Sequence, residues 1–411
     1  MRKKRRIVAE KTRMRRKTRR FIRFARIICS VVDNFYYNIN LRENQTKTVA
    51  MRIKKLLLKN FRNYREETFE FSDGLNVLYG RNAQGKTNCA EAVFYLCTGT
   101  SPRAKKDRQM ILSGEERAFV GAEAESRFGR VSIEAEIFES GREIRVNGIR
   151  IGKNADLLGN INGVFFSPAE LRLVQDGPEE RRRFLNVSIS QMYKSYYTAL
   201  IRYNKILEQR NALLKNRDLD LVFETLPVWD AQLCRYAAEI VERRAGYVAM
   251  LSPAAAKMHA YLTDGAEELE ISSDRHYPQE RAEIEKKLAE EFADNYERDV
   301  RLGFTASGPH RDDLKICIGG KEARVYASQG QARTAALSVK LAEAQIFREL
   351  SGEYPVLILD DVMSELDLAR RRKLLACVDG MQTILTCTHT EKVLFGKTVN
   401  KIRIVGGKIK R

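Results

Sequence analysis

Short apolar runs that stop at glycine, proline or aspartate recur along most of the chain. Residues 53–58, 68–71 and 75–80 each predict a strand, and the last of these, LNVLYG, is apolar enough to be buried. INGVFFSP at 161–168 predicts another buried strand, which ends at proline. Residues 118–151 alternate apolar and polar positions, with turns at FGR and NGIR, and therefore predict an antiparallel meander.

The middle third of the chain repeats its apolar residues at three- and four-residue spacing, which predicts helices. The pattern runs from Pro178 to about Lys215, then over 228–250 and 279–298, and Pro178 is tolerated because it lies near a helix start. The first segment contains four tyrosines that either stack on nucleic-acid bases or pack helix on helix, and the helical spacing favours packing. They are Tyr193, Tyr196, Tyr197 and Tyr203.

An α/β pattern returns after Gly303. We expect a helix from Ser328 to about Leu350, then buried strands in YPVLILDD at 354–361 and in QTILTCTH at 382–389. The order of elements therefore predicts the α/β fold class, with a helical arm or bundle inserted into the α/β domain.

Charge is concentrated at the N-terminus of this protein, whose formal net charge is +19. Residues 1–50 contain 16 Lys or Arg and 3 Asp or Glu, whereas residues 51–411 contain 57 and 51. A basic run is typical of a solvated arm that binds phosphates, and a targeting peptide is a poorer interpretation because no convincing cleavage site follows. The favoured interpretation is a misassigned start, since MRIKKLLLKNFRNY begins at Met51 like a first strand.

Cysteine and apolar content bear on the compartment. The seven cysteines are scattered without CxxC spacing, which indicates reduced thiols in a cytoplasm and neither a disulfide framework nor zinc. No run of 18 apolar residues occurs, so we expect no transmembrane helix and no membrane partner.

GRNAQGKT at 80–87 has the form G-x-x-x-x-G-K-T, follows a predicted strand and precedes a helix predicted over 86–97. Backbone N–H groups of such a loop cradle phosphates, helped by the helix N-terminus. Lys86 is expected to reach the β- and γ-phosphates and Thr87 to bind Mg²⁺. The candidate ATP-binding residues are Gly80, Arg81, Asn82, Ala83, Gln84, Gly85, Lys86 and Thr87.

Two aspartates end the apolar run VLILDD at 356–361. In nucleotidases with this loop, an aspartate at the position of Asp360 holds magnesium, and Asp361 is suited to position the attacking water. The plainer alternative is that both residues cap the next turn. His389, at the end of TCTH, either bonds a γ-phosphate oxygen or has a structural role, and both readings remain open.

YASQGQARTA at 326–335 opens a predicted helix with no nucleophile and no metal ligand. Free N–H groups at the helix start, with Ser328 and Gly330, make an anion site. One nucleotide loop is already complete without this anion site. We therefore expect it to bind the γ-phosphate held by a second copy, so that two chains enclose two ATP molecules.

Six motifs in this order resemble the ABC-type ATPase heads of the DNA-repair and chromosome-maintenance class, and within that class the RecF family over residues 51–411. The resemblance implies an ABC-type P-loop ATPase head with an inserted helical subdomain and no long coiled coil. We expect segments 1–50 (extension), 51–175 (first ATPase part), 176–302 (helical arm) and 303–411 (second ATPase part). The motifs are LKNFRNY 58–64, GRNAQGKT 80–87, FFSPAELRLVQDGPEERRRFLN 165–186, GPHRDDL 308–314, YASQGQARTAALS 326–338 and LDDVMSELD 359–367.

The resemblance also assigns residue roles. It implies magnesium at Thr87 and Asp360, and a catalytic carboxylate at Asp361, where transporter-type relatives usually have glutamate. A loop that senses magnesium through a glutamine is expected around 165–176, with Gln175 as the candidate. The signature contact in trans falls on Ser328, Gly330 and Gln331, although Gln329 replaces the first glycine of the common S-G-G-Q form.

Proteins of the RecF family bind single- and double-stranded DNA, favour gaps or junctions, and act with RecR and RecO to load RecA onto SSB-coated DNA. The resemblance thus implies an ATP-dependent homodimer with weak, DNA-stimulated ATPase activity. Six basic residues are candidates for a DNA-facing surface, although solvated surface charge is an equal alternative for each. They are Arg62, Arg65, Arg103, Lys105, Lys106 and Arg108.

Two other functions remain as alternatives. A transporter ATPase subunit is disfavoured, because a helical insertion of this length and the GPHRDD motif have no place in it. A DNA-binding scaffold, in which ATP only locks the dimer and hydrolysis is incidental, is distinguished by an Asp361→Asn variant that performs every downstream task.

Overall fold

The computed structural model describes residues 51–216, 218–390 and 399–410. The basic segment 1–50, with its three interpretations, lies outside these described residues. Within the described ranges, no helix has both the length and the apolar character needed to cross a bilayer.

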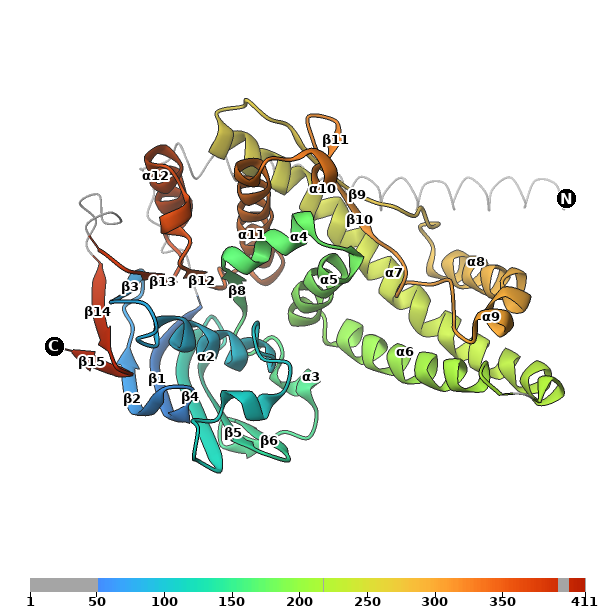
Figure 1. The fold of residues 1–411 in the computed structure, drawn as a ribbon, viewed down its shortest axis with the longest axis horizontal. Helices are drawn as coiled ribbons and strands as arrows, with labels where there is room; N and C mark the ends of the chain where they lie inside the picture. The colour runs from blue at the N-terminus through green and yellow to red at the C-terminus, as the bar shows by residue number, and fades with distance from the viewer. Residues whose placement is uncertain (1–50, 217, 391–398, 411) are drawn as a thin grey trace, which may run out of the picture. The chain divides into compact units, whose positions relative to one another are not determined.

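One six-stranded sheet collects the buried strands that the apolar runs predict (Figure 1). Its strands are β3 (Leu75–Tyr79), β8 (Gly163–Phe166), β12 (Val356–Asp360), β13 (Thr383–Cys387), β14 (Asn400–Val405) and β15 (Lys408–Lys410). They lie in the order β15-β14-β3-β13-β12-β8, parallel except for the β14–β15 hairpin. β12 and β13 are buried at every position, which explains their continuous apolar sequence, because a parallel sheet is covered on both faces.

A second six-stranded sheet is antiparallel throughout, in the order β2-β1-β4-β5-β6-β7, and confirms the predicted meander over 118–151. β1 and β2 extend beyond the predicted strands 53–58 and 68–71. The added residues were missed because most of them are polar and continue no apolar run. The strands are β1 (Arg52–Phe61), β2 (Tyr64–Glu70), β4 (Arg117–Ser126), β5 (Gly129–Phe138), β6 (Gly141–Val146) and β7 (Ile149–Arg150).

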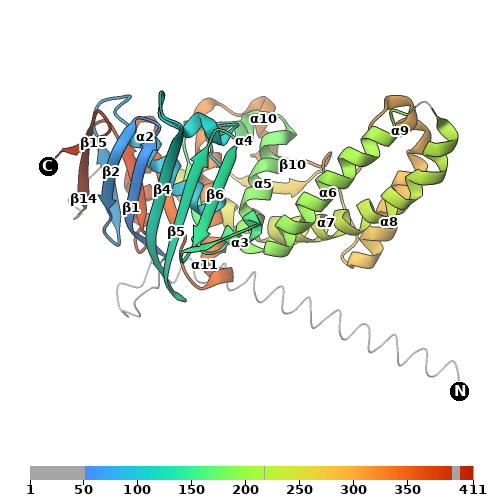
Figure 2. The same cartoon turned by 90° about the horizontal axis from the view of Figure 1, so that it is seen from below.

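Helix α2 (Lys86–Thr98) confirms the helix predicted over 86–97 and lies between the two sheets (Figures 1 and 2). It contacts β8, β12 and β13 of one sheet and β1, β4 and β5 of the other. Every residue from Cys89 to Thr98 is buried. α2 therefore belongs to the core on all sides, and its N-terminus is fixed at the edge of the parallel sheet.

The middle of the chain is helical, as predicted, but its breaks differ from those expected. The segment 178–215 divides at Tyr193, whose backbone is extended (φ −134°, ψ 101°). The helix predicted over 228–250 continues through both Pro227 and Pro253, because packing on its neighbours outweighs the local cost of proline. The helices are α5 (Pro178–Met192), α6 (Lys194–Leu213), α7 (Leu219–Thr263), α8 (Arg281–Asp294) and α9 (Tyr296–Leu302).

The remaining elements connect these parts. A small antiparallel sheet has the order β11-β10-β9, from β9 (Leu269–Ser273), β10 (Leu314–Ile318) and β11 (Lys321–Glu322). α11 (Gln329–Ser351) confirms the helix predicted from Ser328, and it packs against α7. The shorter segments are η1 (Asp107–Met110), α3 (Asn154–Leu157), η2 (Pro168–Leu171), α4 (Arg172–Gln175), α10 (Ala323–Tyr326), η3 (Met363–Glu365) and α12 (Leu368–Cys377).

The division at 175/176 and 302/303 remains a prediction. α7 begins in the arm and packs on α11 of the following segment, so the two segments share buried residues. The 45 residues of α7 make it the longest helix among those described. α7 packs against α6 and α8 and does not extend into a coiled coil.

Candidate nucleotide-binding site

The loop between β3 and α2 has a backbone conformation that requires glycine at two positions. Gly80 (φ 148°) and Gly85 (φ 116°) both lie in the left-handed region, as does Ala83 (φ 62°). A Cβ on Gly80 would clash with the carbonyl oxygen of Ile404, and one on Gly85 would lie 2.7 Å from Tyr64 Oη. The two glycines of the motif are therefore required by φ and by space.

Lys86 is folded over this loop. Its Nζ donates to the carbonyl oxygens of Gly80 at 2.7 Å and Arg81 at 2.8 Å. Burial lowers the pKa of Lys86, and the charge of Asp361 opposes this effect. The ammonium is thus held on the loop by two neutral oxygens, from which a phosphate anion can recruit it.

Thr87 and Asp360 meet across the chain. Thr87 Oγ1 donates to Asp360 Oδ1 at 2.9 Å, and Thr386 Oγ1 donates to the same oxygen at 2.7 Å. Thr386 lies opposite Asp360 in the parallel register of β12 and β13 and also accepts the N–H of Asp361 at 3.0 Å. Burial raises the pKa of Asp360, while the two hydroxyl hydrogen bonds oppose the rise.

A hydroxyl and a carboxylate in direct contact are the donor set that fits Mg²⁺, which prefers hard oxygen ligands. Thr87 and Asp360 would hold the ion, and this role remains a prediction. The chemistry of the donors agrees with that expectation, and no group of three or more His, Cys, Asp or Glu residues forms a separate metal cluster in the described ranges.

Asp361 leaves the strand in a left-handed conformation (φ 53°). Ser364 Oγ donates to its carbonyl oxygen at 2.9 Å and to Oδ1 at 3.3 Å. The charge of Asp361 opposes the fall in the pKa of Lys86 that burial causes. A backbone of this kind in a non-glycine residue is uncommon and is found at functional sites.

The other two candidates near the sheet edge are less well placed. Cys387, the last residue of β13, pairs with Tyr79, the last residue of β3. His389 follows two residues later and is exposed, so it lies at the carboxyl end of the strands, where the nucleotide loop begins. Its role on phosphate remains a prediction. Gln175 is exposed at the end of α4, two short helical segments beyond β8. Ser167, buried and next after β8, lies nearer Asp360 in register, since Phe166 pairs with Leu359.

The signature residues form the start of α11. Ser328 Oγ accepts the N–H of Gln331 at 3.2 Å, and Gln331 Oε1 accepts the N–H of Ser328 at 2.9 Å, which is a capping box. Gln331 Nε2 also donates to Glu267 at 3.0 Å. Ser328 is exposed, and a Cβ on Gly330 would meet nothing closer than 4.0 Å. The described hydrogen bonds and ion pairs join none of these residues to the loop 80–87.

Sequence reasoning missed two residues that connect these motifs. Thr386 bridges both aspartates, and its place before His389 in TCTH, combined with parallel pairing, is the signal that identifies it. Arg333 of α11 lies 2.7 Å from the carboxylate of Glu365, which follows the aspartates in SELD. The signature helix is therefore tied to the segment after Asp361 within one chain.

The six basic candidates separate in the structure. Arg62 is half-buried, and its guanidinium is bidentate on the fully buried Glu91 at 2.7 and 2.9 Å. Arg103 and Lys105 line a cleft beside α5, whereas Arg65, Lys106 and Arg108 do not. Of the four tyrosines, Tyr196 and Tyr203 are buried between helices, which supports packing over base stacking.

Comparison with known sequences identifies the family. The family model described as RecF/RecN/SMC N terminal domain matches residues 52–410. The DNA replication and repair protein RecF of Clostridium acetobutylicum is 41% identical over 363 residues, which are 87% of this chain and 99% of the relative. RecF of Acetivibrio thermocellus is 41% identical over 350 residues, which are 83% and 94% of the two chains.

Solved structures agree with the sequence relatives. The recombination mediator protein RecF-ATP in the RecFOR pathway is similar with a TM-score of 0.81 and 34% identity, covering 90% of this chain and 99% of that one. The Smc head domain of Pyrococcus furiosus, at 17% identity and a TM-score of 0.52, covers 88% of this chain and 95% of its own, and shares the fold alone. Because the family match spans nearly all described residues and RecF relatives reach 41% identity, the chain belongs to the RecF family of DNA replication and repair proteins.

Proposed function

We propose that this protein is an ATP-dependent DNA-binding protein of replication and recombinational repair, which closes as a homodimer around two ATP molecules. One observation carries the proposal: no described hydrogen bond or ion pair joins the cap residues Ser328, Gly330 and Gln331 to the loop 80–87 of their own chain. The loop 80–87 and its aspartates occupy the sheet edge, while the exposed cap of α11 has no described bond to them. A second copy supplies the missing cap.

The loop residues bind and orient the triphosphate. Backbone N–H groups of the loop and of the α2 N-terminus point to phosphate oxygens, and Lys86 exchanges its carbonyl partners for them. Thr87 and Asp360 would hold Mg²⁺, which would neutralise charge on the phosphates. Asp361 orients the attacking water, and His389 donates to a γ-phosphate oxygen.

The cap of α11 acts in trans. Ser328 and Gly330 present an open helix N-terminus to the γ-phosphate of the other copy, where exposed N–H groups and the helix dipole favour an anion. Gln331 holds the cap in shape through its reciprocal bond with Ser328. Hydrolysis removes the group that both copies share, so the dimer loosens.

The nature of the relatives supports the cellular role. RecF-ATP is a recombination mediator in the RecFOR pathway, and by this relationship we assign RecO and RecR as partners and single- and double-stranded DNA as the ligand. The protein acts in the cytoplasm on gapped or junction DNA and assists RecA loading. Its ATPase activity is slow and stimulated by DNA.

Light scattering on residues 51–411, with and without ATP and Mg²⁺, tests the dimer. The expected result is a doubling of mass with ATP, which Lys86→Met and Ser328→Arg abolish and Asp361→Asn prolongs. Ser328→Ala is the matched control for Ser328→Arg, because it removes the cap hydroxyl without filling the open surface. An unchanged mass, or normal dimerisation of Ser328→Arg, would contradict the arrangement in trans.

The same variants distinguish a dimer that ATP hydrolysis releases from DNA from a scaffold in which hydrolysis is incidental. If hydrolysis times release, Asp361→Asn binds DNA and dimerises but fails to dissociate, measured by the decay of labelled DNA complexes after ATP dilution. Asp361→Asn complexes that dissociate at the wild-type rate would favour a scaffold in which hydrolysis is incidental.

A further inference from the structure

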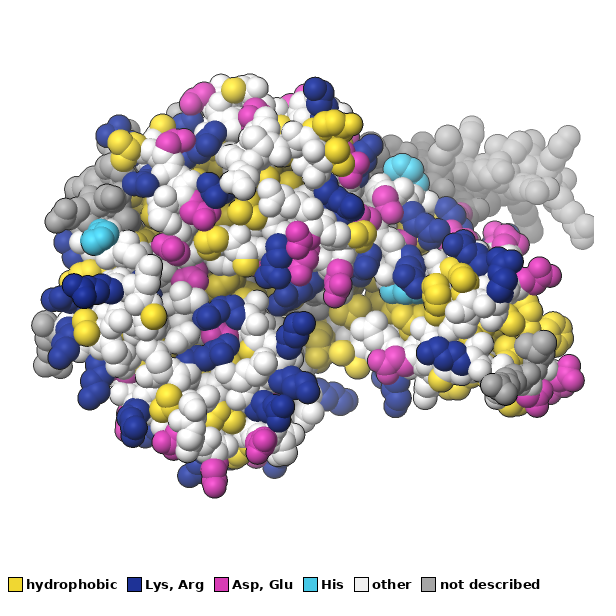
Figure 3. All heavy atoms as spheres, viewed as in Figure 1, with side chains coloured by type: hydrophobic (Ala, Val, Ile, Leu, Met, Phe, Trp, Pro, Cys, Tyr) yellow, Lys and Arg dark blue, Asp and Glu magenta, His cyan; other side chains and the backbone are white. Residues whose placement is uncertain are grey.

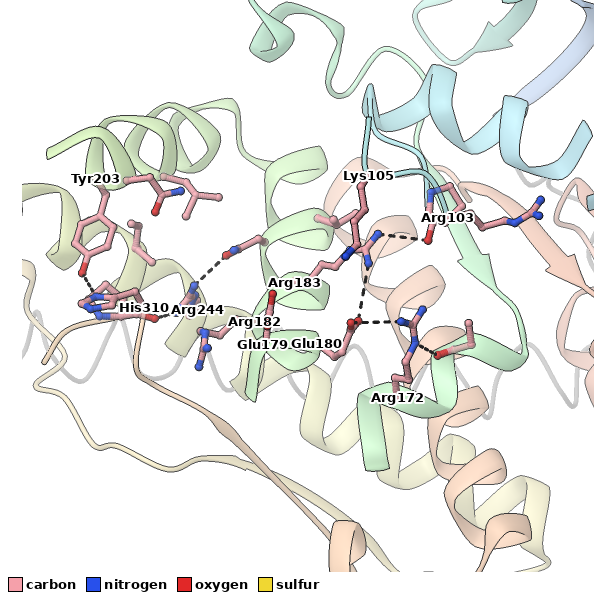
Figure 4. Close-up of a pocket in the computed structure, with 18 of the residues that line it drawn as sticks. Arg103, Lys105, Arg172, Glu179, Glu180, Arg182, Arg183, Tyr203, Arg244 and His310 are labelled. Carbon is pink, nitrogen blue, oxygen red and sulfur yellow. Dashed lines mark hydrogen bonds and ion pairs between the residues drawn. The ribbon is translucent and has the colours of Figure 1, made fainter. Parts of the chain in front are cut away.

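Two motifs that the nucleotide site does not use meet at one cleft. The arginine-rich start of α5 and the GPHRDD loop line it together with the loop after α2, and its volume is about 1090 Å³ (Figure 4). Lys and Arg side chains also gather around a hollow in this part of the surface (Figure 3). The basic residues of the lining are Arg103, Lys105, Arg172, Arg182, Arg183 and Arg244.

Three consecutive arginines of α5 hold the walls in place. Arg181 is bidentate on Asp313 of the GPHRDD loop, at 2.7 and 2.8 Å, and is nearly buried. Arg182 donates to the carbonyl oxygen of Asp312 at 3.0 Å and faces the cleft. Arg183 turns to the opposite wall, 3.5 Å from the carbonyl oxygens of Ser101 and Pro102. The first turn of α5 therefore contacts both walls of the cleft, the GPHRDD loop on one side and the loop after α2 on the other.

Positive charge in the cleft exceeds the negative charge that faces it. Glu180 is shared by Arg172 at 3.7 Å and Arg183 at 4.0 Å, and Glu179 is the other acidic residue of the lining. Arg103 lies 3.5 Å from the carboxylate of the buried Glu91, which also pairs with Arg62. No ion pair to Lys105, Arg182 or Arg244 occurs among the described residues, and Lys105 is exposed.

Arg244 is a buried cation that hydrogen-bonds to neutral groups alone. The residue is only 7% exposed, yet its guanidinium donates to neutral oxygens alone: Tyr196 Oη at 3.1 Å, the Pro309 carbonyl at 2.6 Å and Asn186 Oδ1 at 2.9 Å. Burial, followed by the charge of Arg244, lowers the pKa of Arg182. Cations that repel one another at low exposure are stabilised when an anion enters between them.

We propose that this cleft binds the phosphodiester backbone of a short unpaired DNA segment. The inference rests on the proposed DNA-binding function and names the surface that distinguishes a single strand from a duplex. A cavity near 1000 Å³ has the volume of a ligand pocket, which suits a few nucleotides of a flexible single strand and leaves no room for several stacked base pairs of a duplex. Half-buried Val187 and Leu200 add apolar wall on which unstacked bases lie.

Fluorescence anisotropy of labelled oligothymidylate and of a blunt duplex, with the full chain, tests the proposal. The cleft variant is Lys105→Glu with Arg183→Glu, both exposed residues. The matched control is Lys106→Glu with Arg108→Glu, which makes the same charge change nearby and outside the cleft. We expect the cleft variant to weaken oligothymidylate binding at least about tenfold more than the control, and to lower the salt slope by about 2. Duplex binding should change equally in both.

Other outcomes of these measurements would contradict the inference or separate it from the proposed function. Equal loss in both variants, or loss confined to the duplex, overturns the inference. Displacement of the oligonucleotide by millimolar inorganic phosphate at constant ionic strength also overturns it, because the cleft would then be a small-anion site. If the wild type binds no DNA, the proposed function fails as well, whereas wild-type binding with an unaffected cleft variant removes this inference alone. Retained ATP binding verifies that the variants are folded.

Discussion

The nucleotide loop takes its form from eight consecutive residues, whereas the basic cleft draws its side chains from segments around 102–105, 167–187, 200–244 and 309–310. In the loop, two glycines allow a backbone whose N–H groups are suited to cradle phosphate, so a short motif suffices to predict the site. In the cleft, side chains of α5, α6 and α7 are combined with residues of the loops at 102–105 and 309–310. A local site can be recognised in a linear motif, and a site assembled by packing cannot.

The two regions also differ in what holds them. At the sheet edge, neutral hydroxyls bridge the aspartates in the register of parallel strands. At the cleft, a nearly buried ion pair between Arg181 and Asp313 joins α5 to the GPHRDD loop. The first region is rigid because the sheet is buried on both faces, while the second depends on a few charged contacts.

The largest expected effect separates the regions by function. Lys86→Met should lower ATP affinity by at least about 100-fold, because the cation that reaches the phosphates is lost, and should leave oligothymidylate binding to the cleft within about twofold of wild type. Isothermal titration with ATP–Mg²⁺ and anisotropy without nucleotide measure the two sides. Parallel loss of both activities would show that the regions are one site, and Lys55→Met, on exposed surface, is the control.

The next effect concerns stability of the cleft. Arg181→Ala should lower the free energy of unfolding by about 3 kcal/mol, since Asp313 then loses its partner in a largely dry position. Arg183→Ala, whose partners lie at 3.5 to 4.0 Å on an exposed surface, should cost less than about 1 kcal/mol. Urea denaturation followed by circular dichroism compares them. Equal costs would mean that Arg181 does not hold the wall.

A smaller effect is expected at the bridge between the aspartates. Thr386→Val keeps the shape but removes the hydroxyl that serves Asp360 and the N–H of Asp361, which should cost about 1–3 kcal/mol. Magnesium-dependent ATP affinity should fall as well. Thr386→Ser restores the hydroxyl and should recover most of both. If the valine variant matches wild type in magnesium titrations, the bridge does not position the aspartates.

The smallest effect is a pH dependence in the cleft wall. His310 accepts from Tyr203 at 2.6 Å and its Nε2 faces the Thr305 carbonyl at 3.1 Å, and burial lowers its pKa from 6.5 to about 4. Because the folded pKa is depressed, the unfolded chain takes up the proton first as pH falls below about 6.5. The protein should therefore lose about 1–2 kcal/mol of unfolding free energy between pH 7 and pH 4.5 through this group.

His310→Gln isolates that contribution in urea titrations at the two pH values. Asp312, whose pKa burial raises to about 6, acts in the opposite direction and is common to both proteins. A His310→Gln variant that loses as much stability as wild type on acidification would exclude His310 as the source.

Pattern reasoning located the buried strands, α2 and α11 well, because each combines an unbroken or strictly periodic apolar run with a glycine or serine boundary. It misjudged α7, since Pro227 and Pro253 mark ends locally while α6, α8 and α11 pack along the whole helix. The sequence pattern also grouped Arg62 with the surface cations, because the sequence does not show that the buried Glu91 lies beside it.

The sequence by itself determined the nucleotide loop, the two aspartates and the signature cap, together with the family they belong to. Those features depend on backbone conformation and on a few consecutive side chains, which local chemistry dictates. Only the tertiary structure decided that Thr386 joins the aspartates, that Arg62 pairs with the buried Glu91, and that the start of α5 and the GPHRDD segment line one cleft. Contacts between residues far apart in the chain arise from packing, and packing energy is shared among many side chains that no single motif records.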